Sequence, residues 1–309
     1  MYVLFMLLSG CAATQSDCAK DYLRAAAFQR TMMFAGSIDL RWTLIRPERP
    51  VPGQILVRGW WDDGRYRTDV MEHSYKAAIY GPDSRKPGET LEVSIWNGEG
   101  AVIKKVRNST RYLYLLEDHP RTANERLFSP TCLGLPRAGG SQSEPAASMC
   151  LDYDVRRLEK MEDGLVRIDL AAPDSGQVSM LVWFLIDPSR DYAVTEYGFE
   201  AIYKSAHDQS VQTTYTVHGT NELELVGNVW FPMKGRHEQR RNGEFHWANE
   251  FEVLSLQMSA PPDSKKFTWA DLDVPAGELI LSTAAAFPSF EWTEQKAAPI
   301  AGQLRSDGK

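Results

Sequence analysis

The chain has 309 residues, 43% of them hydrophobic and 11% aromatic, so it is long enough to bury a substantial core within one domain. Its formal net charge is −7 and it contains no block of Lys or Arg, which argues against nucleic-acid binding. No segment approaches the roughly 20 apolar residues that a membrane-spanning helix needs. We therefore expect a single domain whose only means of membrane attachment is a lipid.

The N-terminus combines a short apolar run with small residues and a cysteine, Leu8-Ser9-Gly10-Cys11. This arrangement resembles the lipobox of bacterial lipoproteins, in which the cysteine is diacylated and the peptide is cut before it. The resemblance implies that residues 1–10 are a lipoprotein signal remnant and that Cys11 carries lipid. Ala12 rather than Asp follows the cysteine, which resembles lipoproteins sorted to the outer membrane. The alternative is an apolar N-terminus that packs on the domain.

Hydrophobic periodicity predicts one helix at the start of the domain. A helix over residues 17–35, with Gly36 at its end, would place five residues near one face. These residues are Leu23, Ala26, Ala27, Arg30 and Met33. After the helix the period changes from 3.6 to 2, which is typical of strands with one buried face.

Alternating segments then predict strands joined by tight turns. Strands are expected over residues 38–44, 55–61, 66–70, 91–95, 101–106 and 111–116. Asp62-Asp63-Gly64 predicts a hairpin turn, and Asn97-Gly98 and Asn242-Gly243 predict two more, because these residue pairs are typical of two-residue hairpin loops.

The second half of the chain continues this pattern after an interruption at residues 118–150, which we interpret as a long loop or lid insertion. Strands are expected over residues 154–159, 165–170, 177–186, 197–203, 211–217, 223–236 and 245–258. The nearly continuous apolar run at 177–186 predicts a central strand covered on both faces. About a dozen strands at this spacing predict a barrel or a strongly curved antiparallel sheet. Residues 283–309 show little periodicity and are expected to form a loose tail.

The order of these features resembles the bacterial lipoprotein-carrier superfamily that includes LolA, LolB and RseB. The resemblance is carried by the N-terminal helix, the hairpin before Arg65-Tyr66-Arg67, the segment Val229-Trp230-Phe231-Pro232 and the closing Leu272-Asp273-Val274-Pro275-Ala276-Gly277. It implies a mainly β (α+β) fold over residues 11–282, in which an open antiparallel half-barrel has helices covering its concave face. It also implies an apolar cavity that holds acyl chains such as palmitate.

Large side chains at the apolar strand positions are the candidates for lining such a cavity. They are Trp42, Trp61, Tyr66, Phe199, Tyr203, Tyr215, Phe245 and Trp247. The same residues also fill ordinary barrel cores. The expected function is accordingly a lipid-anchored envelope protein on the periplasmic face that binds acyl chains or lipoproteins as a carrier or sensor. The alternative is a non-enzymatic structural or protein-interaction module with a filled core.

The polar residues predict no chemistry. No catalytic motif, metal site or cofactor-binding motif is recognisable, so we do not expect an enzyme. His237 and Glu238 are interpreted as solvated turn residues. Cys132 and Cys150 bracket a loop-like segment that a disulfide would close in an oxidising compartment, and two buried free thiols are the alternative.

Overall fold

The protein is described here from a computed structural model that covers most of the predicted domain. It describes residues 14–73, 92–97, 101–107, 110–116, 133–135, 147, 150–173, 176–205, 212–258, 260–272, 274, 276–282, 288–293 and 296–299. Within these residues no helix is both long enough and apolar enough to cross a lipid bilayer.

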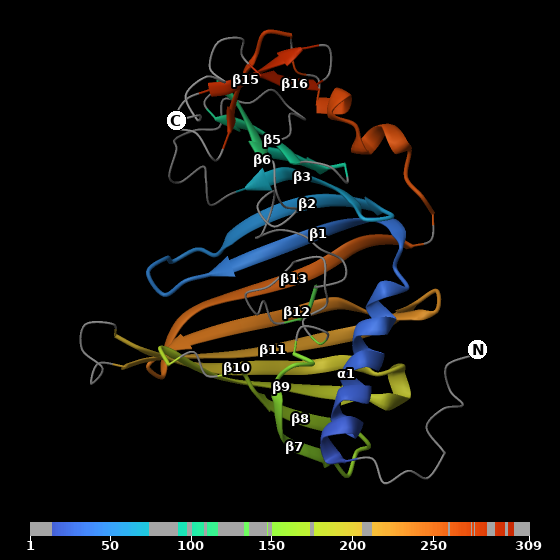
Figure 1. The fold of residues 1–309 in the computed structure, drawn as a ribbon, viewed down its shortest axis with the longest axis vertical. Coiled ribbons are helices and arrows are strands. Elements are labelled where there is room, and N and C mark those ends of the chain that lie inside the picture. The colour runs from blue at the N-terminus through green and yellow to red at the C-terminus, as the bar shows by residue number, and fades with distance from the viewer. Residues whose placement is uncertain are drawn as a thin grey trace, which may run out of the picture.

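The described elements are one α-helix, three short 3-10 turns and sixteen strands (Figure 1). The helix is α1 (Gln15–Thr31), and the 3-10 turns are η1 (Pro188–Arg190), η2 (Ser264–Phe267) and η3 (Trp269–Leu272). The strands of the first half are β1 (Ala35–Ile45), β2 (Gly53–Asp62), β3 (Arg65–His73), β4 (Glu92–Trp96), β5 (Ala101–Arg107) and β6 (Thr110–Leu116). Those of the second half are β7 (Asp154–Lys160), β8 (Val166–Ala171), β9 (Val178–Asp187), β10 (Ala193–Lys204), β11 (Gln212–Val226), β12 (Val229–Arg241) and β13 (Glu244–Met258). The chain then forms β14 (Leu279–Ser282), β15 (Pro288–Thr293) and β16 (Lys296–Pro299).

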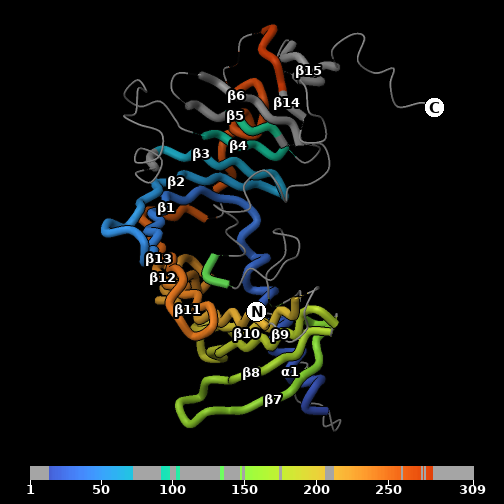
Figure 2. The backbone as a smooth tube through the Cα atoms, turned by 90° about the vertical axis from the view of Figure 1, so that its left-hand side faces the viewer, coloured from blue at the N-terminus to red at the C-terminus, as the bar shows by residue number. Residues whose placement is uncertain are grey.

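All sixteen strands belong to one sheet, in the order β16-β15-β14-β6-β5-β4-β3-β2-β1-β13-β12-β11-β10-β9-β8-β7. Antiparallel pairing of β1 with β13 joins the two halves of the chain, and β14 with β6 is the one parallel pair among the described strands. Seen from the side, the sheet bends into an open arc (Figure 2). The predicted curved, antiparallel half-barrel is therefore confirmed, with more strands than the expected dozen.

Two predicted hairpin turns are confirmed by their backbone geometry. Asp63 and Gly64 have φ values of 44° and 76° between β2 and β3. Asn242 and Gly243 have φ values of 51° and 82° between β12 and β13. Positive φ at both central residues defines the hairpin turn whose twist matches that of the flanking strands. The predicted turn at Asn97-Gly98 continues into residues that lie outside those described.

Helix α1 starts at a capping box, in which Asp17 N–H donates to the Thr14 hydroxyl and Thr14 N–H donates to the Asp17 carboxylate. All five residues predicted for its buried face are buried: Leu23, Ala26, Ala27, Arg30 and Met33. The helix ends at Thr31, earlier than predicted, and Gly36 lies within β1. A Cβ atom on Gly36 would lie 2.3 Å from the Gln257 carbonyl oxygen and 2.6 Å from the Trp61 ring, so this glycine permits close packing of the strands.

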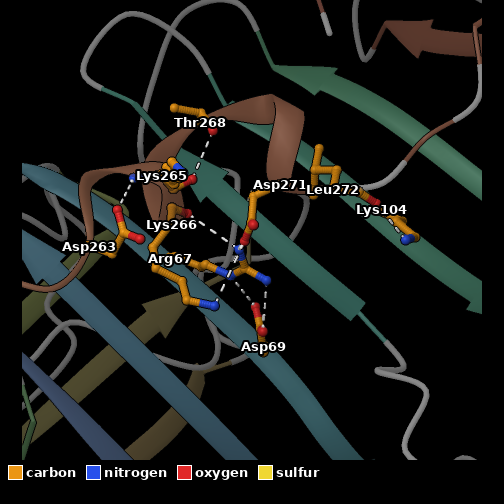
Figure 3. Close-up of polar contacts among 9 residues, drawn as sticks. All are labelled: Arg67, Asp69, Lys104, Asp263, Lys265, Lys266, Thr268, Asp271 and Leu272. Carbon is orange, nitrogen blue, oxygen red and sulfur yellow. Dashed lines mark hydrogen bonds and ion pairs between the residues drawn. The ribbon is translucent and has the colours of Figure 1, made fainter.

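Different segments of the chain cover the two faces of the sheet. Helix α1 lies on the concave face, where it packs on β7, β10 and β12 (Figure 1). On the opposite face, residues 260–272, which we call the strap, cross from β13 towards β14. Under the strap lies a small core of Val93, Ile95, Val102, Leu272 and Ile280. Arg67 of β3 holds the strap through Asp271 and the Lys266 carbonyl oxygen (Figure 3).

Two predictions about the strands are wrong. Strand β9 is third from one edge of the sheet, and one of its faces is open, since Leu181 is 51% exposed. Its apolar run is therefore not a sign of burial on both faces. The tail was expected to be loose, but residues 288–293 form β15 and residues 296–299 form β16. Strand β15 pairs with β14 across the predicted domain boundary at residue 282. Pairing with a partner strand gives these residues an order that their own periodicity does not indicate.

Candidate functional site on the concave face

Strand register assigns the predicted lining residues to faces, because residues directly opposite each other in neighbouring strands point to the same side. Val182, Phe199 and Val217 are opposite one another across β9, β10 and β11, and all three belong to the core under α1. The same reasoning, applied strand by strand, places seven of the eight predicted residues on this concave face. They are Trp42, Trp61, Tyr66, Phe199, Tyr203, Tyr215 and Trp247.

Phe245 is the exception, and its assignment to the concave face is wrong. The register between β12 and β13 shifts between Gln239 and Arg240, so Trp247 lies opposite Gln239 while Phe245 lies opposite Arg240. Two residues that are two positions apart normally share a face, but a bulge between them reverses one of them. Phe245 therefore lies on the convex face with Arg240.

One group of lining residues, the β1–β3 aromatic cluster, consists of Trp42, Trp61 and Tyr66. Trp61 is 2% exposed and its indole N–H donates to the Met33 carbonyl oxygen at 2.9 Å. Trp42 is partly buried against Phe251, with ring centroids 5.6 Å apart. The Trp42 Nε1 atom is buried without a hydrogen-bond partner among the described residues. The cluster therefore combines core packing with one unused donor.

A second group, the β10–β13 aromatic row, consists of Tyr197, Tyr203, Tyr215, His237 and Trp247. The Tyr197 hydroxyl and His237 Nδ1 are 3.0 Å apart and share a hydrogen bond. His237 stacks on Trp247 with centroids 5.0 Å apart, and Tyr203 meets Tyr215 edge-on at 5.5 Å. Tyr203 is 46% exposed, so the row extends from the core to the solvent. The ring of Tyr197 lies flat over Gly219, where a Cβ atom would come within 2.1 Å of it.

Two members of this row, Tyr197 and His237, are not among the residues predicted to line the concave face. Tyr197 was read only as part of a strand, and His237 was interpreted as a solvated turn residue. In the structure His237 lies within β12 on the concave face, while Glu238 points to the opposite face. Alternation along β12 is the sequence signal that could have identified His237, because Gly235, His237 and Gln239 share the concave face.

The cover of the concave face comes from the two segments that the sequence suggested. Helix α1 buries small apolar residues there, together with Arg30, whose guanidinium lies 5.6 Å from the Phe231 ring centroid. Within the predicted insertion at 118–150, Leu133 packs near the β1–β3 aromatic cluster and Leu135 packs under α1. Asn221 Nδ2 donates to the Gly134 carbonyl oxygen at 2.7 Å and so attaches this segment to β11.

Of the three cysteines with a predicted role, only Cys150 lies among the described residues. Cys11 and Cys132 lie outside them, so the lipid site and the disulfide stay predictions. Cys150 lies in the core under α1, where desolvation raises the pKa of its thiol form to about 12. A thiol with this pKa is inert at neutral pH, which agrees with a structural position in the core.

A hollow of about 580 Å³ lies on the convex face over β1, β11, β12 and β13. Charged side chains dominate its wall, and none of the eight predicted residues lines it. Arg236 pairs there with Glu238 and Glu250. Hydrogen bonding from Arg236 and then from Arg240 lowers the pKa of Glu238, although its partial burial opposes this shift. Arg236 and Arg240 are therefore both engaged in ion pairs with carboxylates.

Comparison with known proteins gives matches only among solved structures. No protein-family model and no curated protein matches the chain. A LolA superfamily protein from Nitrosomonas europaea matches with a TM-score of 0.44 and 11% identity, over 81% of this chain and 97% of that one. A DUF1329 family protein from Desulfovibrio piger matches with a TM-score of 0.46 and 11% identity, over 83% of this chain and 98% of that one. A domain described as an outer membrane lipoprotein-sorting protein from Vibrio parahaemolyticus matches with a TM-score of 0.40 and 10% identity, over 82% and 99%.

Proposed function

We propose that this chain is a lipid-anchored protein of the bacterial cell envelope that binds an acyl chain on its concave face, as a non-enzymatic carrier or sensor. Cys11 carries the anchor, and the protein works on the periplasmic side, at the outer rather than the inner membrane. The acyl chain belongs to a lipid or to a lipoprotein. It lies between the sheet and a cover formed by α1 and part of residues 118–150.

The main support for this proposal is the β10–β13 aromatic row, which continues the buried core out to solvent on the same face as α1. A row that served only to fill the core would not need to extend to Tyr203, which is 46% exposed. Each methylene of a bound chain contributes about 0.8 kcal/mol when it is buried, so ten of them would offset the cost of ordering a cover. The Trp42 indole N–H, which lacks a partner among the described residues, offers a donor for the carboxylate or ester end.

A fluorescent sixteen-carbon fatty acid tests the proposal directly, with the full chain carrying Cys11→Ser so that its own lipid is absent. Tyr203→Glu should weaken binding about tenfold or more, because it places a charge beside the acyl chain. Leu181→Glu is the matched control, since Leu181 is 51% exposed on the other face of the neighbouring strand β9. Equal affinities for the parent and the Tyr203→Glu variant would refute acyl-chain binding on this face.

The alternative function, an interaction module with a filled core, is favoured by one observation. Leu133, Leu135, Ala147 and Cys150 are all buried against the sheet, so the inserted segment occupies part of the space that a ligand would use. Mass spectrometry of an organic extract of the purified protein separates the two functions. A stoichiometric acyl lipid supports the carrier, and a clean extract together with no fatty-acid binding supports the module.

A further inference from the structure

The outward side of α1 carries an exposed apolar patch at its C-terminal end. Phe28, Met32 and Phe34 are 51%, 53% and 63% exposed, respectively. Phe28 and Met32 are one helical turn apart and therefore neighbours on the helix surface. Phe34 follows Met33, which points into the core and is 3% exposed, so Phe34 points away from it. We call these three residues the α1 patch.

The α1 patch carries no charge of its own. Between residues 25 and 35 the only ionisable side chain is that of Arg30, which is 1% exposed and directed at Phe231. The charged residues of the outward side lie nearer the start of the helix, where Arg24 pairs with Asp21 at 2.8 Å. The surface of α1 therefore changes along its length from a neutral ion-paired part to an uncharged apolar part.

The covalent chain limits how far this helix can move from the anchor. Only three bonds between residues separate Cys11 from Thr14, the N-cap of α1, and they span at most about 11 Å. The 17 residues of α1 measure about 25 Å along the axis. With lipid on Cys11, the start of α1 stays at the bilayer surface. The α1 patch reaches the same surface when the helix lies along it.

We propose that the outward side of α1 is a membrane-docking surface, with Phe28, Met32 and Phe34 inserted at the boundary between head groups and acyl chains. The inference rests on the proposed function for the anchor at Cys11. Because α1 lies on the concave side of the sheet (Figure 2), docking through the outward side of the helix turns the concave face towards the bilayer. An acyl chain then passes between membrane and protein without crossing bulk water. Apolar side chains on one helix side are the usual means of such interfacial contact.

Vesicle binding by the unacylated full chain, Cys11→Ser, tests the α1 patch apart from the lipid. Sucrose-loaded phosphatidylcholine vesicles should sediment with the protein. Replacing Phe28, Met32 and Phe34 by Ser should lower the partition coefficient at least tenfold. The matched control replaces Leu181, Leu254 and Leu279 by Ser. These three residues are 51%, 43% and 54% exposed elsewhere on the sheet, and their loss should change partitioning less than twofold.

Two further readouts make the outcome specific. Binding should be the same at 0.1 M and 0.5 M salt, because the α1 patch is uncharged and screening acts on charges. The triple Ser variant should keep the circular-dichroism spectrum of its parent and its fatty-acid affinity.

Absence of vesicle binding in the parent, equal binding by the patch variant, or loss of binding in salt would overturn the inference. Dimerisation that the patch variant abolishes, without vesicle binding, would overturn it in favour of a second copy of the chain. Vesicle binding without any fatty-acid binding would refute the proposed function and leave the inference standing.

Discussion

The two covers of the sheet differ in the interactions that hold them. On the concave side α1 packs mainly through small and apolar residues such as Ala19, Leu23 and Ala26. On the convex side the strap is held by Arg67, whose Nε and Nη2 donate to the two Asp69 carboxylate oxygens at 2.7 and 2.9 Å while Nη1 donates to Asp271 (Figure 3). The Arg67 side chain is only 7% exposed.

This difference assigns different roles to the two faces. Apolar contacts are non-directional, so a helix held by them can shift while it stays packed. Charge-assisted hydrogen bonds to a buried guanidinium require one geometry, and breaking them leaves buried charges without partners. The part of the convex face that the strap covers, over β3 to β5, is therefore closed by a rigid cover. The concave face, with α1 and the aromatic row, is the face that can admit a ligand.

Of the changes to the two covers, loss of the Arg67 guanidinium should lower the stability of the protein most. Arg67→Met should lower the free energy of unfolding by about 4 kcal/mol, because the Asp69 carboxylate, which is 9% exposed, then loses its guanidinium partner and the strap loses the contact between Arg67 and Asp271. Urea denaturation followed by tryptophan fluorescence measures the change. Arg41→Met is the control, since Arg41 and Glu252 form an exposed pair that contributes at most about 1 kcal/mol. Similar losses of unfolding free energy in Arg67→Met and Arg41→Met would mean that the charge of Arg67 does not hold the strap.

Truncation on the apolar cover should have the next largest effect. Leu23→Ala leaves a cavity between α1 and the core and should cost about 3 kcal/mol, since Leu23 is fully buried. Hydrogen exchange should speed up in α1 before it does so in the strap, because the helix has few directional bonds to the sheet. Arg24→Ala on the outward side is the control. Uniform acceleration of both covers would show that they open as one unit.

Removal of the helix cap should have the smallest effect, and that effect should depend on pH. Thr14→Ala should lower stability by about 1 kcal/mol at pH 7. The hydrogen bond with the Thr14 side chain, and then the bond with its backbone N–H, lowers the pKa of Asp17 below 3.8. A depressed folded-state pKa contributes stability above the unfolded pKa, and this contribution is lost as the pH falls through the folded value. Urea titrations at pH 7 and pH 2.5 should therefore show the difference between wild type and Thr14→Ala narrowing in acid. A constant difference would contradict the capping box.

Much of the fold could be predicted from local pattern. The buried face of α1, the turns at Asp63-Gly64 and Asn242-Gly243, and the alternating strands all depend on neighbours within a few residues. The concave placement of Trp42 or Tyr215 followed from the same period of 2. Phe245 was misplaced because a bulge depends on the register with the partner strand, which alternation along one strand does not contain.

Non-local contacts explain the remaining differences. The sequence predicted no structural role for the strap, of which only the closing segment from Leu272 to Gly277 was noted. Nothing near Asp271 in sequence indicates that its partner is Arg67 of β3, about 200 residues away. The hydrogen bond between Tyr197 and His237 likewise joins residues that are distant in sequence. Strands β15 and β16 were missed because each is ordered by its partner strand.

The sequence by itself determined the class of fold, the curved antiparallel sheet, the helical cover and most of the aromatic residues of the concave face. These features follow from side-chain periodicity and turn chemistry, which act over short separations. Only the tertiary structure decided which face each cover occupies, where β9 lies in the sheet, and that Arg67, Asp69 and Asp271 hold the strap on the convex side. Such features depend on pairing between distant segments, and the energy of a buried charge is determined by the partners that the fold brings to it.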